Sequence, residues 1–380
     1  MEPGQRRTIG VVGASCRAMA ASLIRADYQV TAGDLFADYD TQQLAAATTL
    51  SKYPWSAPDW LSKTTVDAWC FTGGIENYPR LVQRMSRHAP LLGATPDALR
   101  KVRDPFWLAD VAKRYGFHFP ESKRLDEASS STVFNEPWLK KPYRSAGGLR
   151  IETVQEPPGC SSQFFLQRQL SGTPMSMALL STKKKVHVVG LCRLQIGFNF
   201  GAPGMFLFAG GVTSLQPVSQ ELRAIAEAIH AEAKMLGLWG IDFLQTDKPT
   251  VLEVNPRWTA SMALHDRRSA IALMGMHVAA CEGREVDALS LSDDSAAAFR
   301  ILYARQPIDF RQEVFEQIAA AFDLSREATI AGPEFADVPF PGSRIETGFP
   351  VCTLYADGAT EEEAEASLAA KIERVESLLY

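Results

Sequence analysis

The chain has 380 residues, 46% of them hydrophobic and 22% charged, and its formal net charge is −5. This length exceeds one ordinary domain, and the negative charge argues against nucleic acid or an anionic membrane as a partner. No stretch approaches the roughly 18 apolar residues of a membrane span, and the polar N-terminus does not resemble a signal peptide. The six cysteines lack CxxC pairing, which favours reduced thiols and a cytoplasmic location over disulfides or zinc.

The N-terminal stretch has the pattern of a strand, a helix and a second strand. The apolar run 8–12 leads into Gly13-Ala-Ser15-Cys-Arg17, and a second strand, 29–32, ends near Asp34. This arrangement imitates a dinucleotide-binding fingerprint, but Gly-x-Ser stands where G-x-G-x-x-G is required. We therefore favour a Rossmann-like lobe that binds no NAD, and an NAD-dependent oxidoreductase is kept as a rival.

A further buried strand is predicted at 66–71, and the loop Thr72-Gly73-Gly74 follows it. Ligands gather beyond the carboxyl ends of strands in open α/β sheets. We therefore expect a substrate crevice lined by 13–17 and 73–77, although Gly73-Gly74 would also suit a tight turn. The substrate-binding residues predicted in this lobe are Gly13, Ser15, Arg17, Gly73 and Gly74. A short strand at 91–93 and a helical stretch from Pro96 come next.

Residues 138–151 combine lysines with a glycine-rich loop. A strand carries Lys140 and Lys141, the loop contains Ser145, Gly147 and Gly148, and a second strand spans 151–154. Glycines let backbone N–H groups approach phosphate oxygens, and a lysine supplies a positive charge. The loop is not a Walker A motif, because no Gly-Lys-Ser/Thr opens a helix after it. An ordinary glycine hairpin is the alternative interpretation.

The next region predicts strands of a central antiparallel sheet. An apolar strand begins at 163, and further strands are expected at 175–180, 186–194 and 205–208, with the lysines 183–185 in a solvated turn. Gly210-Gly211 would let a substrate approach the backbone closely. A helix with one apolar stripe is predicted at 221–236, ended by Gly237.

Two apolar runs, 240–245 and 250–255, flank the polar turn 246–249 and predict a β-hairpin. A turn centred between Asp247 and Lys248 places Gln245 opposite Thr250 and Asp242 opposite Glu253. Because strand side chains alternate between faces, Asp242, Glu253 and Asn255 share one face. The other face is expected to hold Ile241, Phe243, Leu252 and Val254. Opposed carboxylates repel, so the face suits Mg²⁺, which takes oxygen ligands; an exposed acidic hairpin is the alternative.

The C-terminal part begins with a polar loop at 257–261 and an apolar helix at 269–281. Strands are predicted at 299–303 and 349–355, on either side of a proline-rich segment. Thr360-Glu-Glu-Glu363 is a capping box that opens a last helix. The residues of that helix expected to point inward are Ala364, Leu368, Ile372, Val375 and Leu379.

The string Glu253-Val-Asn255-Pro-Arg257, with Asp242 one strand earlier, resembles the metal-binding hairpin of the ATP-grasp superfamily. The resemblance implies that Asp242, Glu253 and Asn255 hold Mg²⁺, or alternatively Mn²⁺, on the phosphates of ATP. It also implies that Arg257 steadies the transferred phosphoryl group. The 138–151 stretch is similar to the lid of that superfamily, with Lys141 as its lysine and Lys140 on the opposite face. Arg257 and Lys141 are therefore the expected catalytic residues.

The resemblance also implies an ATP site. Many members carry Asp-Lys before a helix at the position of Lys101 and Arg103, and we favour Arg103 as the first cation that contacts ATP. The adenine linker corresponds to the segment from Gln167 to Leu170, where Gln167 replaces the usual acidic residue. The ATP-binding residues implied are Arg103, Lys141, Ser145, Gly147, Gly148, Gln167, Arg168 and Leu170.

The fold implied is the α/β ATP-grasp architecture. It consists of a Rossmann-like substrate lobe at 1–98, a helical segment with a small α+β lid lobe at 99–178, and a larger catalytic α+β lobe with an antiparallel sheet at 179–298. The remaining segment, 299–380, is similar to the C-terminal cap of biotin carboxylase.

The expected function is an ATP-dependent carboxylate–amine ligase that forms an acyl phosphate and releases ADP and phosphate. An amino acid joined to a small amine is a narrower version, as in the similar tyramine–glutamate ligases. The expected partners are the small-molecule carboxylate and amine, and a homodimer is left open. A non-catalytic ATP-binding regulator of the same architecture is a second rival, against which the intact Asp242, Glu253, Asn255 and Arg257 argue.

Overall fold

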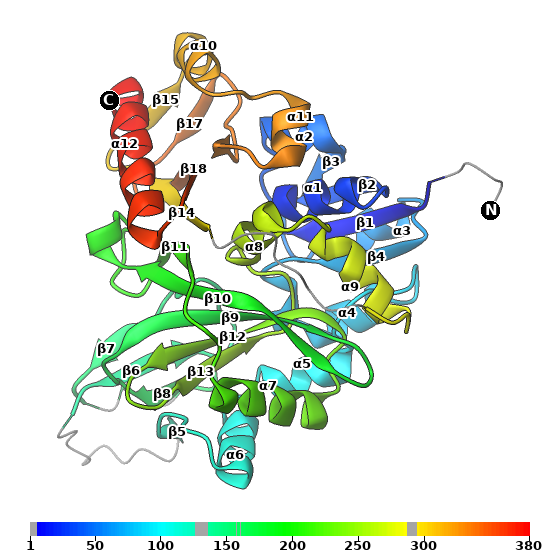
Figure 1. Cartoon of the computed structure of the whole chain (residues 1–380), viewed down its shortest axis with the longest axis vertical. Helices are drawn as coiled ribbons and strands as arrows, with labels where there is room; N and C mark the ends of the chain where they lie inside the picture. Colours follow the sequence, from blue (N-terminus) through cyan, green and yellow to red (C-terminus); the bar gives the residue numbers. More distant parts are fainter. Residues whose placement is uncertain (1–5, 126–135, 157, 160, 287–294) are drawn as a thin grey trace.

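The computed structural model describes residues 6–125, 136–156, 158–159, 161–286 and 295–380. Three layers of structure follow one another in space: an N-terminal parallel sheet, a large antiparallel sheet and a small sheet at the far end (Figure 1). None of the described helices is both long and apolar enough to cross a membrane.

The N-terminal lobe is a parallel sheet in the order β3-β2-β1-β4. Its strands are β1 (Thr8–Gly13), β2 (Gln29–Asp34), β3 (Ala46–Thr49) and β4 (Ala68–Phe71). Its helices are α1 (Arg17–Arg25), α2 (Tyr39–Leu44), α3 (Ala57–Ser62), η1 (Ile75–Asn77) and α4 (Pro79–Met85). The strand predicted at 91–93 is only a single bridge from Leu91 to Trp69. The Rossmann-like order of elements is confirmed.

Two capped helices lead from this lobe to the small sheet. They are α5 (Pro96–Val102) and α6 (Pro105–Tyr115), whose N-cap side chains, Thr95 and Asp104, accept backbone N–H bonds. The small sheet has the order β5-β8-β6-β7. Its strands are β5 (Ser122–Arg124), β6 (Trp138–Pro142), β7 (Glu152–Val154) and β8 (Phe164–Arg168).

The large sheet has eight strands in the order β13-β12-β9-β10-β11-β14-β18-β16, all paired antiparallel. Its first five strands along the chain are β9 (Thr173–Ser181), β10 (Val186–Ile196), β11 (Phe208–Ser214), β12 (Gly237–Gln245) and β13 (Thr250–Asn255). The short helix η2 (Phe198–Phe200) follows β10, and α7 (Gln220–Ala233) packs on the sheet through the main apolar core. The lysines at 183–185 form the predicted turn between β9 and β10.

The strand predicted at 205–208 is wrong for most of its length, because β11 begins only at Phe208. A turn in which the Leu207 N–H donates to the Gly204 carbonyl occupies the preceding residues. The predicted helix 269–281 is also shorter than expected. It begins only at Leu273, as α9 (Leu273–Cys281), whose first N–H donates to Asp266 at 2.7 Å. A separate helix that was not predicted, α8 (Met262–Arg268), precedes it and ends where Ser269 is extended.

The remaining elements complete the large sheet and cover it. They are β14 (Ala296–Tyr303), β15 (Ile308–Phe310), α10 (Gln312–Ala321), α11 (Arg326–Ala331), β16 (Phe335–Ala336), β17 (Ser343–Ile345), β18 (Pro350–Gly358) and α12 (Glu361–Leu379). The predicted cap of α12 is present, since Thr360 accepts the N–H of Glu363. Ala364, Leu368 and Val375 point into the core.

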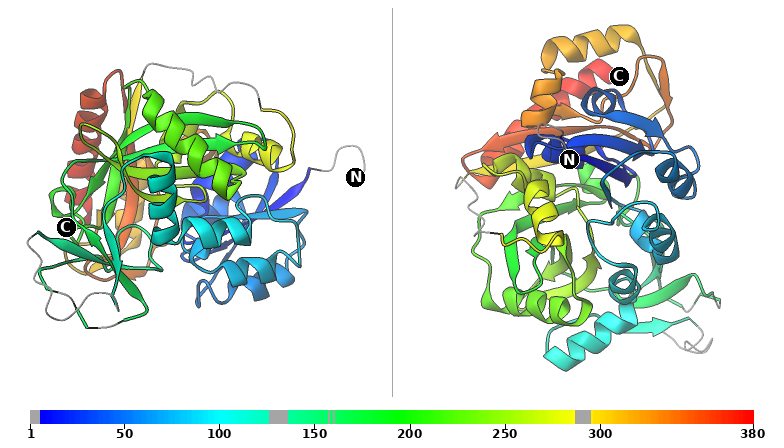
Figure 2. Two further views of the ribbon diagram at one scale, coloured as in Figure 1. Left: turned by 90° about the horizontal axis from the view of Figure 1, so that it is seen from below. Right: turned by 90° about the vertical axis from the view of Figure 1, so that its right-hand side faces the viewer.

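The elements do not end at the lobe limits that we expected. The limits after residues 98, 178 and 298 fall inside α5, β9 and β14 respectively. Helices α8 and α9 lie between the N-terminal sheet and the large sheet (Figure 2), and one apolar cluster joins Leu23 of α1, Met274 of α9 and Leu238 of β12. Five cysteines are free and four of these are buried, in line with the expected thiols, while Cys160 lies outside the described residues.

Candidate functional site

A cavity of about 640 Å³ lies where the sheets meet. This volume is in the usual range of about 300–1,000 Å³ for small-molecule sites. Its lining includes Ser15 and Gly73 from the N-terminal lobe, Lys141 from the small sheet, Glu253 from the large sheet and Tyr355 from the C-terminal segment. Residues far apart in the sequence therefore share one site.

The acidic hairpin forms the floor of this cavity. Asp242 of β12 lies opposite Glu253 of β13, as the sequence predicts, and both line the cavity. The predicted pairing of Gln245 with Thr250 is wrong, because Leu244 faces Thr250 across a β-bulge after Asp242. The extra residue of a bulge shifts the alternation of side chains between faces.

The bulge also changes which apolar residues reach the core. Val251 is fully buried there, beside Ile241, Phe243 and Val254. Leu252, which was expected on the core face, lines the cavity next to Glu253 instead. The bulged strand thus adds an apolar side chain to the site without moving the carboxylates apart.

The two carboxylates are held in different protonation environments. Burial and the neighbouring Glu253 raise the pKa of Asp242 to about 7, and the side-chain N–H of Asn255 donates to its Oδ2 at 2.8 Å. Burial acts in the same direction on Glu253, but Arg103, Lys141 and Arg257 outweigh it and lower the pKa of that carboxyl. The repulsion that burdens Asp242 would be relieved by a cation between the pair.

This donor set fits a hard divalent cation that takes part of its shell from elsewhere. No group of three or more His, Cys, Asp or Glu side chains with metal-binding spacing occurs in the described parts of the chain. Two carboxylates and the Asn255 amide are the kind of partial oxygen set that Mg²⁺ takes when phosphates and water complete its shell.

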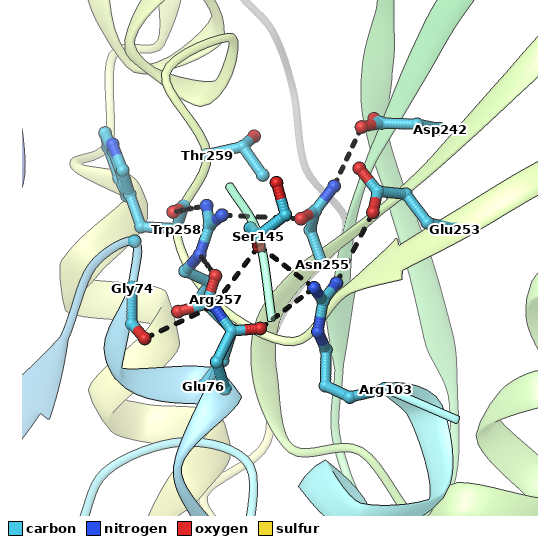
Figure 3. Close-up of polar contacts among 12 residues, drawn as sticks. Gly74, Glu76, Arg103, Ser145, Asp242, Glu253, Asn255, Arg257, Trp258 and Thr259 are labelled. Carbon is cyan, nitrogen blue, oxygen red and sulfur yellow. Dashed lines mark hydrogen bonds and ion pairs between the residues drawn. The ribbon is translucent and has the colours of Figure 1, made fainter. Parts of the chain in front are cut away.

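Arg257 lies at the junction of the hairpin with the N-terminal lobe. Its Nε donates to Oε1 of Glu76 at 2.7 Å, and its Nη1 donates to the Trp258 carbonyl at 3.0 Å. Figure 3 shows the guanidinium held between these two residues, with Asn255 beside it. Glu76 is fully buried, so the ion pair fixes the direction of the arginine.

Arg103 is the cation that reaches the hairpin from the helical segment. Its Nη1 lies 3.4 Å from Oε2 of Glu253, and its Nη2 donates to Oδ1 of Asn77 at 3.0 Å and to the Ser145 carbonyl at 3.1 Å (Figure 3). Lys101, the alternative, points away and donates to the Glu232 carbonyl on α7. The geometry therefore favours Arg103 over Lys101 as the cation facing the site.

The lysine pair of β6 divides between the two faces of the small sheet. Lys141 lines the cavity and donates to Oε1 of Gln167 at 2.9 Å, and burial lowers the pKa of its ammonium despite the nearby Glu253. Lys140 points the other way and donates to Glu152 at 3.2 Å.

The glycine-rich loop of the small sheet reaches across to the large sheet. The N–H of Phe208 donates to the Gly147 carbonyl at 2.9 Å. Gly148 has a φ of +81°, and a Cβ there would lie 1.8 Å from the Phe206 carbonyl oxygen. Ser145, Gly147 and Gly148 all line the cavity.

The expected adenine linker lies at the edge of the same cavity. Gln167, Arg168 and Leu170 line it, but Gln167 is paired on both sides within the small sheet, with Ser122 and Leu139. Its side chain bridges Lys141 and Ser122. Arg168 pairs with Glu136, and Leu170 is partly exposed.

The N-terminal lobe places only part of its predicted set at the cavity. Ser15, Arg17 and Gly73 line it, while Gly13 and Gly74 lie behind them, packed against Thr72 and Tyr53. Asp34 is occupied: its carboxylate accepts the backbone N–H groups of Cys16, Phe36 and Ala37. A carboxylate so engaged is not free to bind a ribose, which argues against an NAD site.

Gly210 and Gly211 do not line the cavity. They lie inside the large sheet, where β11 pairs with β10 and β14. A Cβ on Gly210 would lie 2.2 Å from the Phe299 carbonyl oxygen. A Cβ on Gly211 would lie 2.9 Å from the Arg193 carbonyl oxygen, so the close approach of β14 to Gly210 and of β10 to Gly211 accounts for the two glycines.

Sequence reasoning missed several lining residues from the C-terminal segment. Asp337, Phe299, Ile301, Thr353 and Tyr355 all face the cavity. They lie in or beside strands whose patterns predict only burial, and no local motif marks them. Only the pairing of β14 with β11 and β18 brings them to the site.

Comparison with known proteins places these features in context. Residues 103–261 match a family model described as an ATP-grasp domain. A search of curated proteins found no match.

Solved structures of similar fold cover nearly the whole chain. Carboxyaminoimidazole ribonucleotide synthase from Aspergillus clavatus, complexed with ATP, has a TM-score of 0.69 at 15% identity, over 98% of this chain and 99% of that one. N5-carboxyaminoimidazole synthetase from Staphylococcus aureus, complexed with ADP, gives 0.68 at 12% identity, over 96% of each chain. Biotin carboxylase from Campylobacter jejuni gives 0.68 at 11% identity, over 98% of this chain and 91% of that one. These likenesses show the fold.

Proposed function

We propose that this chain, whose residues 103–261 match an ATP-grasp domain model, is an ATP- and Mg²⁺-dependent ligase that activates a carboxylate as an acyl phosphate and transfers the acyl group to an amine. One observation carries the proposal. Lys141, Arg103 and Arg257 surround the paired carboxylates Asp242 and Glu253 in a single cavity. Phosphoryl transfer depends mainly on positioning and on neutralising charge, and this arrangement supplies both.

Each residue has a distinct part in the proposed reaction. Asp242, Glu253 and Asn255 would hold Mg²⁺, which neutralises phosphate charge when it is bound. Lys141 and Arg103, which line the same cavity, would offer positive charge to the phosphates. The loop with Ser145, Gly147 and Gly148 lines the cavity and would limit the access of water to the reacting groups.

The proposed chemistry has two steps. A carboxylate oxygen attacks the terminal phosphorus of ATP, the bond to ADP breaks, and an acyl phosphate forms. The amine nitrogen then attacks the acyl carbon, phosphate leaves, and the nitrogen releases a proton to give the amide. Arg257, fixed by Glu76, lies beside the metal face and would neutralise first the phosphoryl group and then the acyl phosphate.

The comparisons support the nucleotide part of this proposal. Two of the similar structures are described as complexes with ATP or with ADP. The names of the neighbours do not identify a carboxylate or an amine for this chain.

The test supplies the protein with ATP, Mg²⁺ and a library of carboxylates, with hydroxylamine as a surrogate nucleophile. We expect carboxylate-dependent ADP release together with a hydroxamate product. Release of AMP and pyrophosphate would contradict the phosphoryl-transfer chemistry. Tight ATP binding without turnover on any carboxylate would instead indicate the regulatory alternative.

A further inference from the structure

The cavity extends away from the hairpin into a compartment with aromatic walls. Phe299 of β14 stacks on Tyr355 of β18 with ring centroids 5.6 Å apart, and Phe208 lies 5.8 Å from Phe299. Ile301 lies on the same face of β14, two residues from Phe299, and lines the cavity with them. This wall suits an apolar group rather than a sugar or a phosphate.

One carboxylate lies beside this wall. Asp337 follows β16, lines the cavity and has a side chain that is 24% exposed. Its Oδ1 accepts a hydrogen bond from the Nε–H of Arg17 at 2.9 Å. Its Oδ2 accepts a hydrogen bond from the Thr353 hydroxyl at 2.6 Å. Burial alone would raise the pKa of this carboxyl, but Arg17 and the hydroxyl donors lower it, so Asp337 is anionic at neutral pH.

The charge of the compartment is negative. Among the described lining residues, Arg17 is the cation at this end, whereas Arg103, Lys141 and Arg257 face the hairpin and Arg168 lies in the small sheet. Arg17 is already engaged by Asp337, by Asp40 at 3.4 Å and by the Tyr355 hydroxyl at 3.1 Å. Two carboxylates against one guanidinium leave an excess of negative charge.

We propose that this compartment binds the ammonium group of a substrate with an apolar body, and that Asp337 recognises that ammonium. The inference rests on the proposed function, since the bound molecule would be one of the two substrates of the ligase. A phosphorylated substrate would find no unpaired cation among the described residues at this end. The ribonucleotide in the names of the similar synthases is therefore not the substrate type that fits here.

The ammonium has two chemical sources, the amine acceptor or an amino acid that supplies the carboxylate. Binding to the wild-type protein without ATP separates them. The probes are phenethylamine, phenylalanine, 2-phenylethanol and ribose 5-phosphate, each followed by thermal stability and by titration calorimetry. Binding of phenethylamine assigns the ammonium to the acceptor, and binding of phenylalanine alone assigns it to the carboxylate substrate.

We expect 2-phenylethanol, which has the same body without the charge, to bind at least ~10-fold more weakly than the better ammonium probe, because a charge-assisted hydrogen bond is lost. Equal binding of the alcohol, binding of ribose 5-phosphate only, or binding of none of the probes would overturn the proposal. The readout does not depend on turnover, so absence of ligase activity would leave a positive binding result intact.

Two variants and a matched control locate the site. Asp337→Asn removes the charge, and Ile301→Trp fills the compartment without touching the Arg17 ion pair; each should raise Kd for the bound ammonium probe at least ~10-fold. Arg300→Lys is the control, because Arg300 lies between Phe299 and Ile301 on the opposite face of β14 and bonds Gln195. If Asp337→Asn fails to fold, Ile301→Trp still tests the location. An unchanged Kd in the variants that fold would contradict the assignment.

Discussion

At the scale of single residues, Glu253 offers the sharpest test of the acidic hairpin. Glu253→Gln keeps the shape of the side chain but removes its negative charge. We expect the variant to fold and its Mg-ATP turnover to fall at least ~10²-fold, the scale for losing one electrostatic stabiliser. Steady-state ADP release measures the effect, and Glu152→Gln, on exposed β7, is the control. Wild-type turnover in Glu253→Gln would contradict the assignment of Glu253 as a ligand of Mg²⁺.

The two lysines of β6 provide a second residue-scale test. Lys141 is at the cavity and Lys140 is on the opposite face. Lys141→Ala should reduce turnover sharply, because the phosphates lose a nearby positive charge. Lys140→Ala removes an ion pair with Glu152 and a cation–π contact with Phe164 on the opposite face, and should change turnover little. Initial rates at saturating ATP compare the two variants, and the reverse ranking would show that the face assignment is wrong.

The placement of a single residue can be predicted where the two-residue alternation of side chains along a strand determines its face. The alternation along β12 and β13 puts Asp242 and Glu253 face to face, and the structure has this pair. Leu252 defeats the same rule, because the bulge has no signal in the local sequence. Asp337 and Tyr355 are unpredictable for another reason, since long-range strand pairing alone brings them to the cavity.

At the scale of elements, the glycine-rich loop between β6 and β7 lines the cavity beside the acidic hairpin. Gly148→Ala would place a Cβ against the Phe206 backbone at a φ of +81°. We expect the loop to be displaced and the KM for ATP to rise at least ~5-fold, from strain on the order of 1–3 kcal/mol. Gly116→Ala is the matched control, since its φ is +79° but nothing lies within 4 Å of the added Cβ. An equal KM in the two variants would exclude a role of the loop contact in nucleotide binding.

Elements with strong local signals are predicted best. The last helix begins at its capping box, and α7 follows its apolar stripe. The failures have local causes of a different kind. Strand β11 starts later than expected, at Phe208, because a turn precedes it, and the Asp266 carboxylate accepts the N–H of Leu273 at the start of α9. Side-chain hydrogen bonds of this type depend on the finished fold.

At the scale of the whole molecule, the contact between the N-terminal lobe and the C-terminal segment predicts a pH dependence of stability. Burial and the neighbouring Asp337, Asp40 and Asp34 raise the pKa of Asp38 to about 8. Burial also raises the pKa of Asp40, to about 6, against the opposing effect of Arg17.

A carboxyl whose pKa is higher in the folded state than in the unfolded state holds its proton more firmly in the fold. Its contribution is complete below the unfolded pKa and is lost as the pH rises through the folded pKa. We therefore expect the contribution of Asp38 and Asp40 to the Tm to fall from about pH 4, the ordinary pKa of an aspartate, to about pH 8. Asp38→Asn should flatten this profile and raise the Tm at pH 8, as scanning calorimetry would measure. A profile in Asp38→Asn identical to the wild type would contradict the role of Asp38.

The overall architecture can be predicted because it follows from the order of helices and strands along the chain. The βαβ opening and the acidic hairpin define the kind of fold, and the described elements follow that order. The predicted limits after residues 178 and 298 fall inside the strands β9 and β14. A limit between lobes that is drawn from the sequence follows changes in residue pattern. The extent of a sheet is instead determined by the hydrogen bonds between its strands.

The strand order of the large sheet has a consequence for how the chain is made. The edge of β11 pairs with β14, which is synthesised about 80 residues later, and β14 in turn pairs with β18. During translation, a nascent chain that ends before β14 presents β11 as an unpaired edge, the kind of surface on which chains aggregate. Phe299 and Tyr355 join the cavity only after both strands have left the ribosome. The complete site is thus one of the last features of the molecule to form, and a product truncated before residue 296 would lack it.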